Sequence, residues 1–204
     1  MSRVICISRQ HGTGGYDIAK QLSKELGIPC YDKEVLDEAL ANTDLPKEVL
    51  RAASEHKTNP FLHTVYYEGK HKEYYGKDAH TIVFDMQKKI IRKKAQAGDC
   101  IFVGRCADAV LANVEGVEVF NVFLTSPINE RINYVMKTDH LNMKDAVIAI
   151  KKMDKKRELY YKYFTKNDWG KPSTYDLTIN VGKWGIKQTA KMIKGIYEQM
   201  DWTE

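Results

Sequence analysis

A glycine-rich stretch near the N-terminus contains the residues best suited to binding an anion. The stretch covers residues 9–17 and reads RQHGTGGYD. It follows an apolar run at 4–7, which predicts a short buried strand, and precedes 18–26, where apolar residues recur at helical spacing. Glycines let the backbone turn tightly and approach a ligand, and a helix N-terminus offers free N–H groups with partial positive charge. The order strand, glycine turn, helix therefore predicts a phosphate cradle, with a purely structural glycine turn as the alternative.

The nearest known spacing is the P-loop pattern G-x-x-x-x-G-K-[ST]. With Gly14 set on its second glycine, the stretch departs from this pattern at three positions. Arg9 replaces the first glycine, Gly15 replaces the lysine, and Tyr16 replaces the residue whose hydroxyl binds the metal ion. We still expect the stretch to bind phosphates, through Arg9, His11, Gly12, Thr13, Gly14, Gly15 and Tyr16.

The missing lysine leaves the phosphates of a nucleotide without their usual cation. A helix N-terminus supplies only about half a unit of positive charge. Arg9 and His11 are the nearest cationic side chains in the sequence. Arg9 is charged at any working pH, whereas a histidine with the ordinary pKa of about 6.5 is mostly neutral at pH 7. We therefore expect Arg9 to replace the lysine, unless it pairs with an acidic side chain such as Asp17.

The composition is that of a soluble globular protein. The 204 residues, 43% hydrophobic and 29% charged, predict a single domain over 1–204, and the net charge of +5 suits anionic partners. The sequence has no run of about 20 apolar residues and no signal-peptide core after Met1. The four cysteines lack metal-site spacing and predict buried thiols in a reducing compartment. We therefore expect a cytoplasmic protein.

Short apolar runs alternate along the chain with helical patterns. The runs are 4–7, 28–31, 100–103, 117–124 and 177–181, and the main helical patterns cover 34–40, 79–97, a stretch from about 143, and one from 186. This alternation predicts an α/β fold with a five-stranded parallel sheet covered by helices on both faces. Asp32 follows the second run and Arg105 the third, at the strand ends where such sheets bind ligands. Asp32 could also N-cap the next helix, and the two roles are compatible.

Residues 42–78 interrupt this alternation. The segment begins with a short helical pattern and continues, from Phe61 to Tyr75, with interleaved tyrosines, histidines and lysines. It has no apolar stripe long enough for a core element, so we expect an excursion from the sheet that serves as a substrate flap or a partner surface. Aromatic and cationic side chains also stack on bases, which leaves RNA binding open.

Several motifs, in this order, resemble the cytidylate kinase-like family, a divergent branch of the P-loop nucleoside monophosphate kinases. The motifs are ISRQHGTGG at 7–15, IPCYDK at 28–33, VGRCAD at 103–108, DKKR at 154–157 with YY at 160–161, and WG at 169–170 with YDL at 175–177. The resemblance covers most of the chain and implies a three-layer P-loop kinase fold. It also implies transfer of the ATP γ-phosphoryl group to a nucleoside monophosphate, or another small phosphate acceptor, with magnesium.

The resemblance implies which residues face the acceptor. Arg105 would grip it, since a planar guanidinium suits a phosphate or a base edge, and pairing with Asp108 is the alternative. Asp32 and Lys33 would also face the acceptor, and Asp32 could hold magnesium through water. The segment 42–78 would then lie on the acceptor side.

The resemblance also implies a set of catalytic residues. A lid would lie at 154–174 and bring in Asp154 and Arg157, whose neighbours are strongly basic. Arg131 would enter the site from the preceding helix, unless it pairs at the surface with Glu130. The further lid cations are Lys155, Lys156, Lys162 and Lys166.

The departures from the family pattern leave three hypotheses for the function. Besides the changes in the glycine stretch, Cys106 stands where cytidylate kinases carry an aspartate after the glycine–arginine pair. The first hypothesis is a phosphotransferase that uses ATP, the second a nucleotide-binding sensor or partner-binding module without catalysis, and the third an RNA-binding domain. We favour the first because Asp32, Arg105 and the lid cations fall where phosphate chemistry needs them. A small phosphorylated substrate is the expected partner, rather than a membrane or a nucleic acid, and the oligomeric state stays open.

Overall fold

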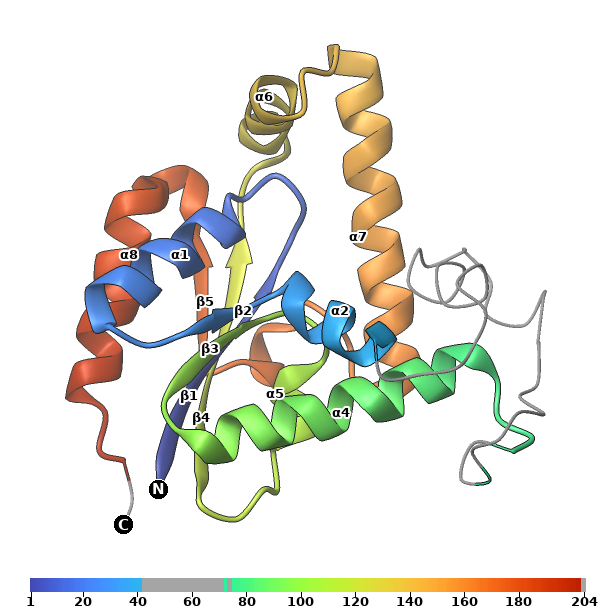
Figure 1. Ribbon diagram of the computed structural model, residues 1–204. Helices are drawn as coiled ribbons and strands as arrows, with labels where there is room; N and C mark the ends of the chain where they lie inside the picture. The colour runs from blue at the N-terminus through green and yellow to red at the C-terminus, as the bar shows by residue number, and fades with distance from the viewer. Residues whose placement is uncertain (42–71, 73–74, 203–204) are drawn as a thin grey trace.

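A sheet of five parallel strands forms the centre of the molecule (Figure 1). The computed structural model describes residues 1–41, 72 and 75–202. The strands stand in the order β2-β3-β1-β4-β5, so that β1, the first in sequence, lies in the middle. The predicted five-stranded parallel sheet is confirmed. The strands are β1 (Ser2–Arg9), β2 (Cys30–Tyr31), β3 (Cys100–Val103), β4 (Val117–Thr125) and β5 (Leu177–Asn180).

Helices cover both faces of this sheet, and β1 contributes to the core on each side. Ile5 and Ile7 are buried together with residues of α1 and α8. Val4 and Cys6 are buried together with residues of α2, α4 and α5. Because successive strand residues point to opposite faces, a strand covered on both sides must be apolar throughout. The flanking helices are α1 (Gly15–Leu26), α2 (Lys33–Ala41), α4 (Ala79–Ala97), α5 (Ala107–Leu111) and α8 (Val181–Gln199).

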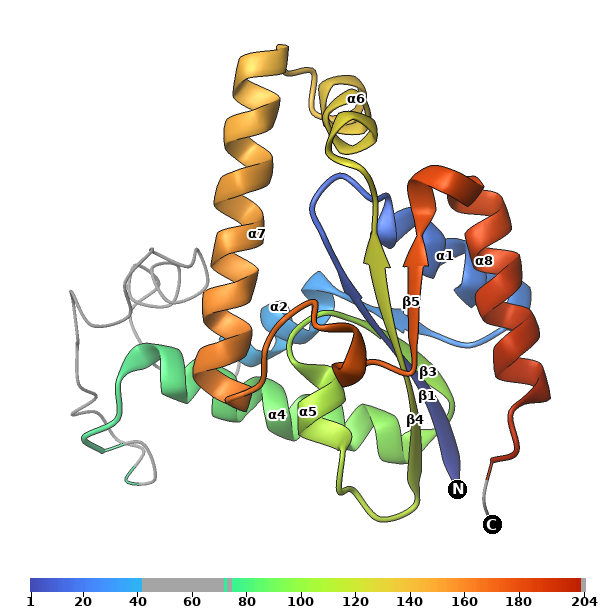
Figure 2. The same ribbon diagram turned by 180° about the vertical axis from the view of Figure 1, so that it is seen from behind.

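Two further helices project beyond the carboxyl ends of the central strands (Figures 1 and 2). They are α6 (Ile128–Thr138) and α7 (Met143–Thr165), which pack on each other through a small apolar cluster of their own. The far end of α7 returns to α4, where Phe164 stacks on Phe84 with ring centroids 4.0 Å apart. The pair α6–α7 thus stands over the edge of the sheet from which the glycine-rich stretch emerges.

The element bounds agree with the sequence patterns best in the middle of the chain. The helix predicted at 79–97 and the strand predicted at 100–103 occupy those residues. The last strand ends at Asn180 rather than 181, and the closing helix begins at Val181, five residues before the predicted start. α8 bends at Gly185, whose φ of 73° is not helical, so its first residues form a segment separate from the helical stripe that begins at Ile186.

The predicted lid at 154–174 contains more than one kind of structure. Residues 154–165 are the last turns of α7, and the connection to the short 3-10 helix η2 (Pro172–Thr174) begins after Thr165. Most of the aromatic segment 61–75, like most of the predicted excursion at 42–78, lies outside the described residues. Among the helices that the structure describes, none is both long and apolar enough to cross a membrane. The four cysteines are free thiols.

Candidate phosphate-binding site

A cavity of about 1090 Å³ lies at the carboxyl ends of the central strands. Its walls come from the loop after β1, the turn after β3, and the helices α6 and α7. The volume slightly exceeds the roughly 300–1,000 Å³ that is usual for one small ligand, which leaves room for a donor and an acceptor together. The lining includes every residue predicted to bind phosphate or acceptor: Arg9, His11, Gly12, Thr13, Gly14, Gly15, Tyr16, Asp32, Lys33 and Arg105.

Residues 9–15, called the glycine loop below, open the N-terminus of α1 into this cavity. Gly12 and Gly14 have φ angles of 83° and 70°, a region that glycine adopts without steric cost. Gly14 is the N-cap of α1 and provides no side-chain hydrogen bond. The first N–H groups of a helix have no acceptor within the helix. Together with the helix dipole, they form an anion-binding site at the cavity wall.

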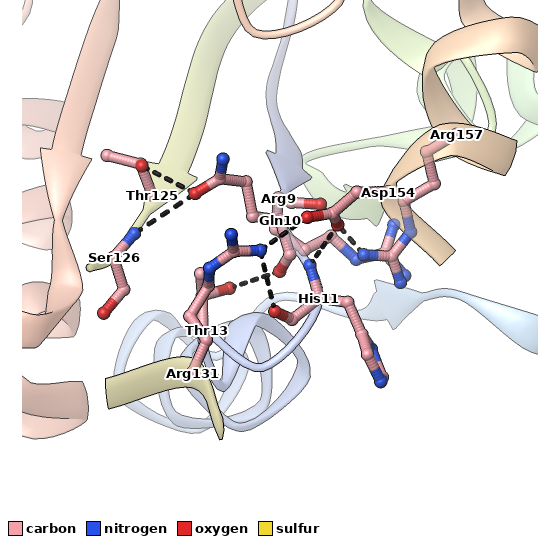
Figure 3. A network of polar contacts seen from close by, with 9 residues as sticks. All are labelled: Arg9, Gln10, His11, Thr13, Thr125, Ser126, Arg131, Asp154 and Arg157. Atoms are coloured by element: carbon pink, nitrogen blue, oxygen red, sulfur yellow. Dashed lines mark hydrogen bonds and ion pairs between the residues drawn. The ribbon is translucent and has the colours of Figure 1, made fainter. Parts of the chain in front are cut away.

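Side chains from α6 and α7 form hydrogen bonds with the backbone of the glycine loop (Figure 3). The backbone N–H of His11 donates to Asp154 Oδ1 at 2.7 Å. Arg131 Nη1 donates to Asp154 Oδ2 at 2.5 Å and to the carbonyl oxygen of His11 at 3.3 Å. One turn further along α7, Arg157 Nη1 donates to the carbonyl oxygen of Arg9 at 3.0 Å. Three of the predicted catalytic side chains therefore contact the loop itself.

Arg157 differs from Arg131 and Asp154 in its position relative to the cavity. Arg157 lines the cavity, whereas Arg131 and Asp154 are not among the lining residues that the structure describes. Arg131 is 8% exposed and forms its ion pair with Asp154 rather than with Glu130. The surface pair with Glu130 considered for Arg131 is therefore wrong, since the side chain points inward against the loop. The geometry of Arg131 and Asp154 is that of residues that position the loop.

Arg9 pairs with a carboxylate, but not with the one considered from the sequence. Its Nη2 lies 3.5 Å from Asp32 Oδ1, and both side chains are largely buried. Asp17 instead accepts a hydrogen bond from the Tyr134 hydroxyl at 2.6 Å. The side chain of Arg9 thus runs from the end of β1 toward the end of β2 and lines the cavity between them.

The turn after β3, residues 104–106, has an unusual backbone and is called the arginine turn below. Gly104, Arg105 and Cys106 have φ angles of 76°, 60° and 53°, so three consecutive residues are left-handed. Non-glycine residues pay a steric penalty there, and such strain is typical of functional sites. The alternative pairing of Arg105 with Asp108 is wrong, because buried Asp108 accepts a hydrogen bond from the Tyr161 hydroxyl at 2.5 Å. Arg105 lines the cavity.

Arg9, Arg105 and Arg157 line the cavity close enough for their charges to act on one another. Burial lowers the pKa of Arg9, an effect that Asp32 partly offsets and Arg105 reinforces. Burial and then the charge of Arg9 lower the pKa of Arg157 to about 9. Burial followed by the charge of Arg157 also lowers the pKa of His11, which keeps its imidazole neutral at pH 7. The arginines repel one another in the ligand-free protein, and a bound anion would relieve that repulsion.

The described residues offer magnesium little protein coordination. No group of three or more His, Cys, Asp or Glu side chains among them is placed to hold a metal ion. Tyr16, at the position of the metal-binding hydroxyl, is 43% exposed and has no aliphatic hydroxyl to offer. Magnesium usually binds one or two carboxylates together with substrate phosphates and waters. Asp32, which lines the cavity together with Glu34 and Asp139, is the predicted ligand for this mode, although it is already paired with Arg9.

Some residues of the site lie in the family motifs, but the sequence did not predict their contacts. Gln10 fixes the glycine loop to β4, because its Oε1 accepts hydrogen bonds from the Thr125 hydroxyl at 2.7 Å and the Ser126 N–H at 3.3 Å. Asp108 and Tyr161 join α5 to α7 behind the arginine turn. Each of these contacts links residues far apart in the sequence, where no spacing rule applies.

The fold is that of the P-loop kinases. Shikimate kinase from Bacteroides thetaiotaomicron has the same fold, with a TM-score of 0.53 at 12% identity over 97% of this chain and 98% of the other. APS kinase from Mycobacterium tuberculosis, in complex with AMPPNP and APS, has a TM-score of 0.54 at 14% identity over 97% and 98%. An uncharacterised protein from Eubacterium ventriosum is more similar, with a TM-score of 0.73 at 25% identity over 98% and 100%.

The chain belongs to the cytidylate kinase-like family, whose model matches residues 4–183. It is also similar to the cytidylate kinases of Pyrococcus horikoshii, at 22% identity over 57% of this chain, and of Methanopyrus kandleri, at 26% identity over 53%. The match spans 60% of the length of either relative. The resemblance found in the sequence motifs is thereby confirmed.

Proposed function

We propose that the protein transfers the γ-phosphoryl group of ATP to a nucleoside monophosphate such as cytidylate, or to another small phosphate acceptor. One observation supports this most directly: Arg9, Arg105 and Arg157 line one cavity beside the open N-terminus of α1. Phosphoryl transfer depends mainly on positioning and on neutralising charge around several phosphate oxygens. The family and the relatives named cytidylate kinase support the same reaction.

The arrangement suggests a division of roles. The glycine loop and the first turn of α1 bind the donor phosphates, while Arg105, Asp32 and Lys33 face the acceptor from the ends of β3 and β2. Arg157 lies between the two groups and bonds the loop backbone. Magnesium, held by Asp32 through water, would neutralise part of the phosphate charge when bound.

We also propose that the basic segment at 154–174 acts as a lid. Its α7 part already contacts the glycine loop, so the part expected to move is the connection after Thr165. Hydrogen exchange of 166–172 should slow when a nucleotide that joins donor and acceptor is bound. Equal exchange rates with and without that ligand would contradict a lid.

The test of the proposed function is ADP release from ATP with a panel of nucleoside monophosphates, with and without magnesium. We expect one or a few acceptors to stimulate ADP release well above the rate with ATP alone. Arg105→Ala should remove this stimulation. Arg92→Ala, which removes an exposed arginine on α4 that does not line the cavity, serves as the matched control. No stimulation by any acceptor would contradict the proposal.

A second candidate is a nucleotide-binding module without catalysis. It is favoured by one observation, that the His11 N–H in the glycine loop is occupied by the Asp154 carboxylate. A loop without lysine and with one N–H already bonded has fewer groups for a γ-phosphate. Nucleotides that raise the melting temperature without any acceptor-dependent ADP release would support this candidate.

A further inference from the structure

The backbone conformation at position 15 does not require a glycine. It is the first residue of α1, and it is absent from the residues with positive φ. Most amino acids tolerate such a position, and lysine stands there in the P-loop pattern. A Cβ atom on Gly15, however, would lie 2.8 Å from Cγ and 3.1 Å from Cβ of Arg9. The side chain of Arg9 therefore fills the space that any side chain at position 15 would need.

A second glycine borders the other end of the same side chain. A Cβ atom on Gly104 would lie 2.2 Å from Nη1 of Arg9. Arg9 thus passes over Gly15 with its aliphatic part and over Gly104 with its guanidinium group, and its Nη2 ends beside Asp32. These contacts define a slot, formed by Gly15, Gly104 and Asp32, that fixes the direction of the Arg9 side chain.

The slot leaves the guanidinium group able to bind a further anion. The ion pair with Asp32 uses Nη2, and a guanidinium carries five N–H donors in a rigid fork. Arg9 lines the cavity between the glycine loop and Arg105. One carboxylate faces it, against the positive charges of Arg105 and Arg157. The site therefore has room, donors and charge for a phosphate oxygen.

We propose that Arg9 supplies the donor phosphates with the positive charge that a P-loop lysine would supply from position 15, and that glycine at 15 and 104 admits its side chain. The proposal rests on the proposed function. In the P-loop pattern, glycine stands at the position of Arg9 and lysine at the position of Gly15. Here the cation stands at position 9 and the glycine at position 15. The two arrangements exclude each other sterically. Gly15→Lys alone should therefore not improve ATP binding, and in the Arg9→Ala background it should restore part of the affinity that Arg9→Ala loses.

Calorimetric binding of ATP to the parent and four variants tests the charge. Arg9→Ala should lose about tenfold to a hundredfold in affinity, as expected for a hydrogen bond to a charged group. Gly15→Lys alone should bind no better than the parent, because Arg9 blocks the new side chain. The double variant Arg9→Ala with Gly15→Lys should bind ATP more tightly than Arg9→Ala alone. Arg92→Ala is the control for loss of an arginine. If Arg9→Ala binds ATP as tightly as the parent, the proposal is overturned.

Urea unfolding tests the slot without any ligand. Gly15→Ala should lower the unfolding midpoint of the parent, because its Cβ meets Cγ of Arg9, and should lower it less in the Arg9→Ala background, where the contact with Cγ is gone and only the 3.1 Å contact with Cβ remains. Gly195→Ala, in open space on α8, is the control and should behave alike in both backgrounds. An equal change for Gly15→Ala in both backgrounds overturns the slot. A parent that binds no ATP overturns the proposed function and the role of Arg9 toward phosphate, and the unfolding result still decides the steric part.

Discussion

The glycine loop and the arginine turn border the same cavity, and both contain left-handed backbone positions, but different kinds of residue occupy those positions. In the loop, the left-handed positions are Gly12 and Gly14, where this conformation carries no steric penalty. In the turn, Gly104 is followed by Arg105 and Cys106, which carry side chains at positive φ. Each such residue costs about 1–2 kcal/mol. The difference indicates that the loop acts through its backbone N–H groups, whereas the turn retains particular side chains despite the strain.

The largest effect should come from removing the anchor of the glycine loop. Asp154→Ala leaves the buried Arg131 without its counter-charge and the His11 N–H without its acceptor. We expect the free energy of unfolding to fall by about 3 kcal/mol, measured by urea titration. Asp154→Asn keeps an acceptor for His11 but loses the charge, so its loss should be smaller. Equal losses for both variants would show that the N–H contact contributes nothing.

In the arginine turn, the chemical nature of the Arg105 side chain should affect activity. Arg105→Lys keeps the charge but loses the planar fork, so we expect kcat/KM for the acceptor to fall about tenfold or more. The KM for ATP should stay close to that of the parent, because the glycine loop is intact. Steady-state kinetics with each substrate varied in turn make the comparison. Unchanged constants for every accepted substrate would exclude this role for Arg105.

Because the arginine turn is strained, we expect one substitution in it to raise the stability of the protein and to remove its activity. Arg105→Gly removes a left-handed side chain, and after the entropy cost of glycine we expect a gain of about 0.5–1 kcal/mol in unfolding free energy. Acceptor-dependent ADP release should be lost at the same time. His140→Gly, at a φ of 55° between α6 and α7, is the control and should gain stability without losing activity. A destabilised Arg105→Gly would contradict strain at this position.

The smallest effect concerns the pH dependence contributed by His11. Burial, followed by the charge of Arg157, lowers its pKa in the folded protein, and Arg131 acts in the same direction against Asp139 and Asp154. The unfolded chain then binds more protons than the folded one as pH falls below about 6.5. Stability from this group is present above that pH and is lost on acidification through the lowered folded pKa. The difference in unfolding free energy between pH 7 and 5 should therefore be smaller in His11→Asn than in the parent.

The sequence allowed the fold and the walls of the cavity to be predicted, because both depend on local patterns. Apolar runs and helical spacing mark the strands and helices, and parallel strands place Arg9, Asp32 and Arg105 at one edge of the sheet. Recognition of the family rested on short motifs of the same local kind.

The contacts across the site could not be predicted in the same way. That Arg9 would pair with Asp32 rather than Asp17 depends on the path of its side chain over Gly15 and Gly104. That Asp154 would bond the loop depends on how α7 stands over it. Such contacts are set by packing between distant segments, which leaves no periodicity to detect.

The central place of β1 has a consequence for how the chain folds during its synthesis. Its two neighbours, β3 and β4, lie about a hundred residues further along the chain. At roughly 5–20 residues per second, a ribosome needs on the order of ten seconds to deliver them. During that time the apolar residues of β1, which later fill both cores, have no strand to pair with. We expect folding to be slow and to begin after β4 has emerged, as for other sheets with mainly long-range pairing.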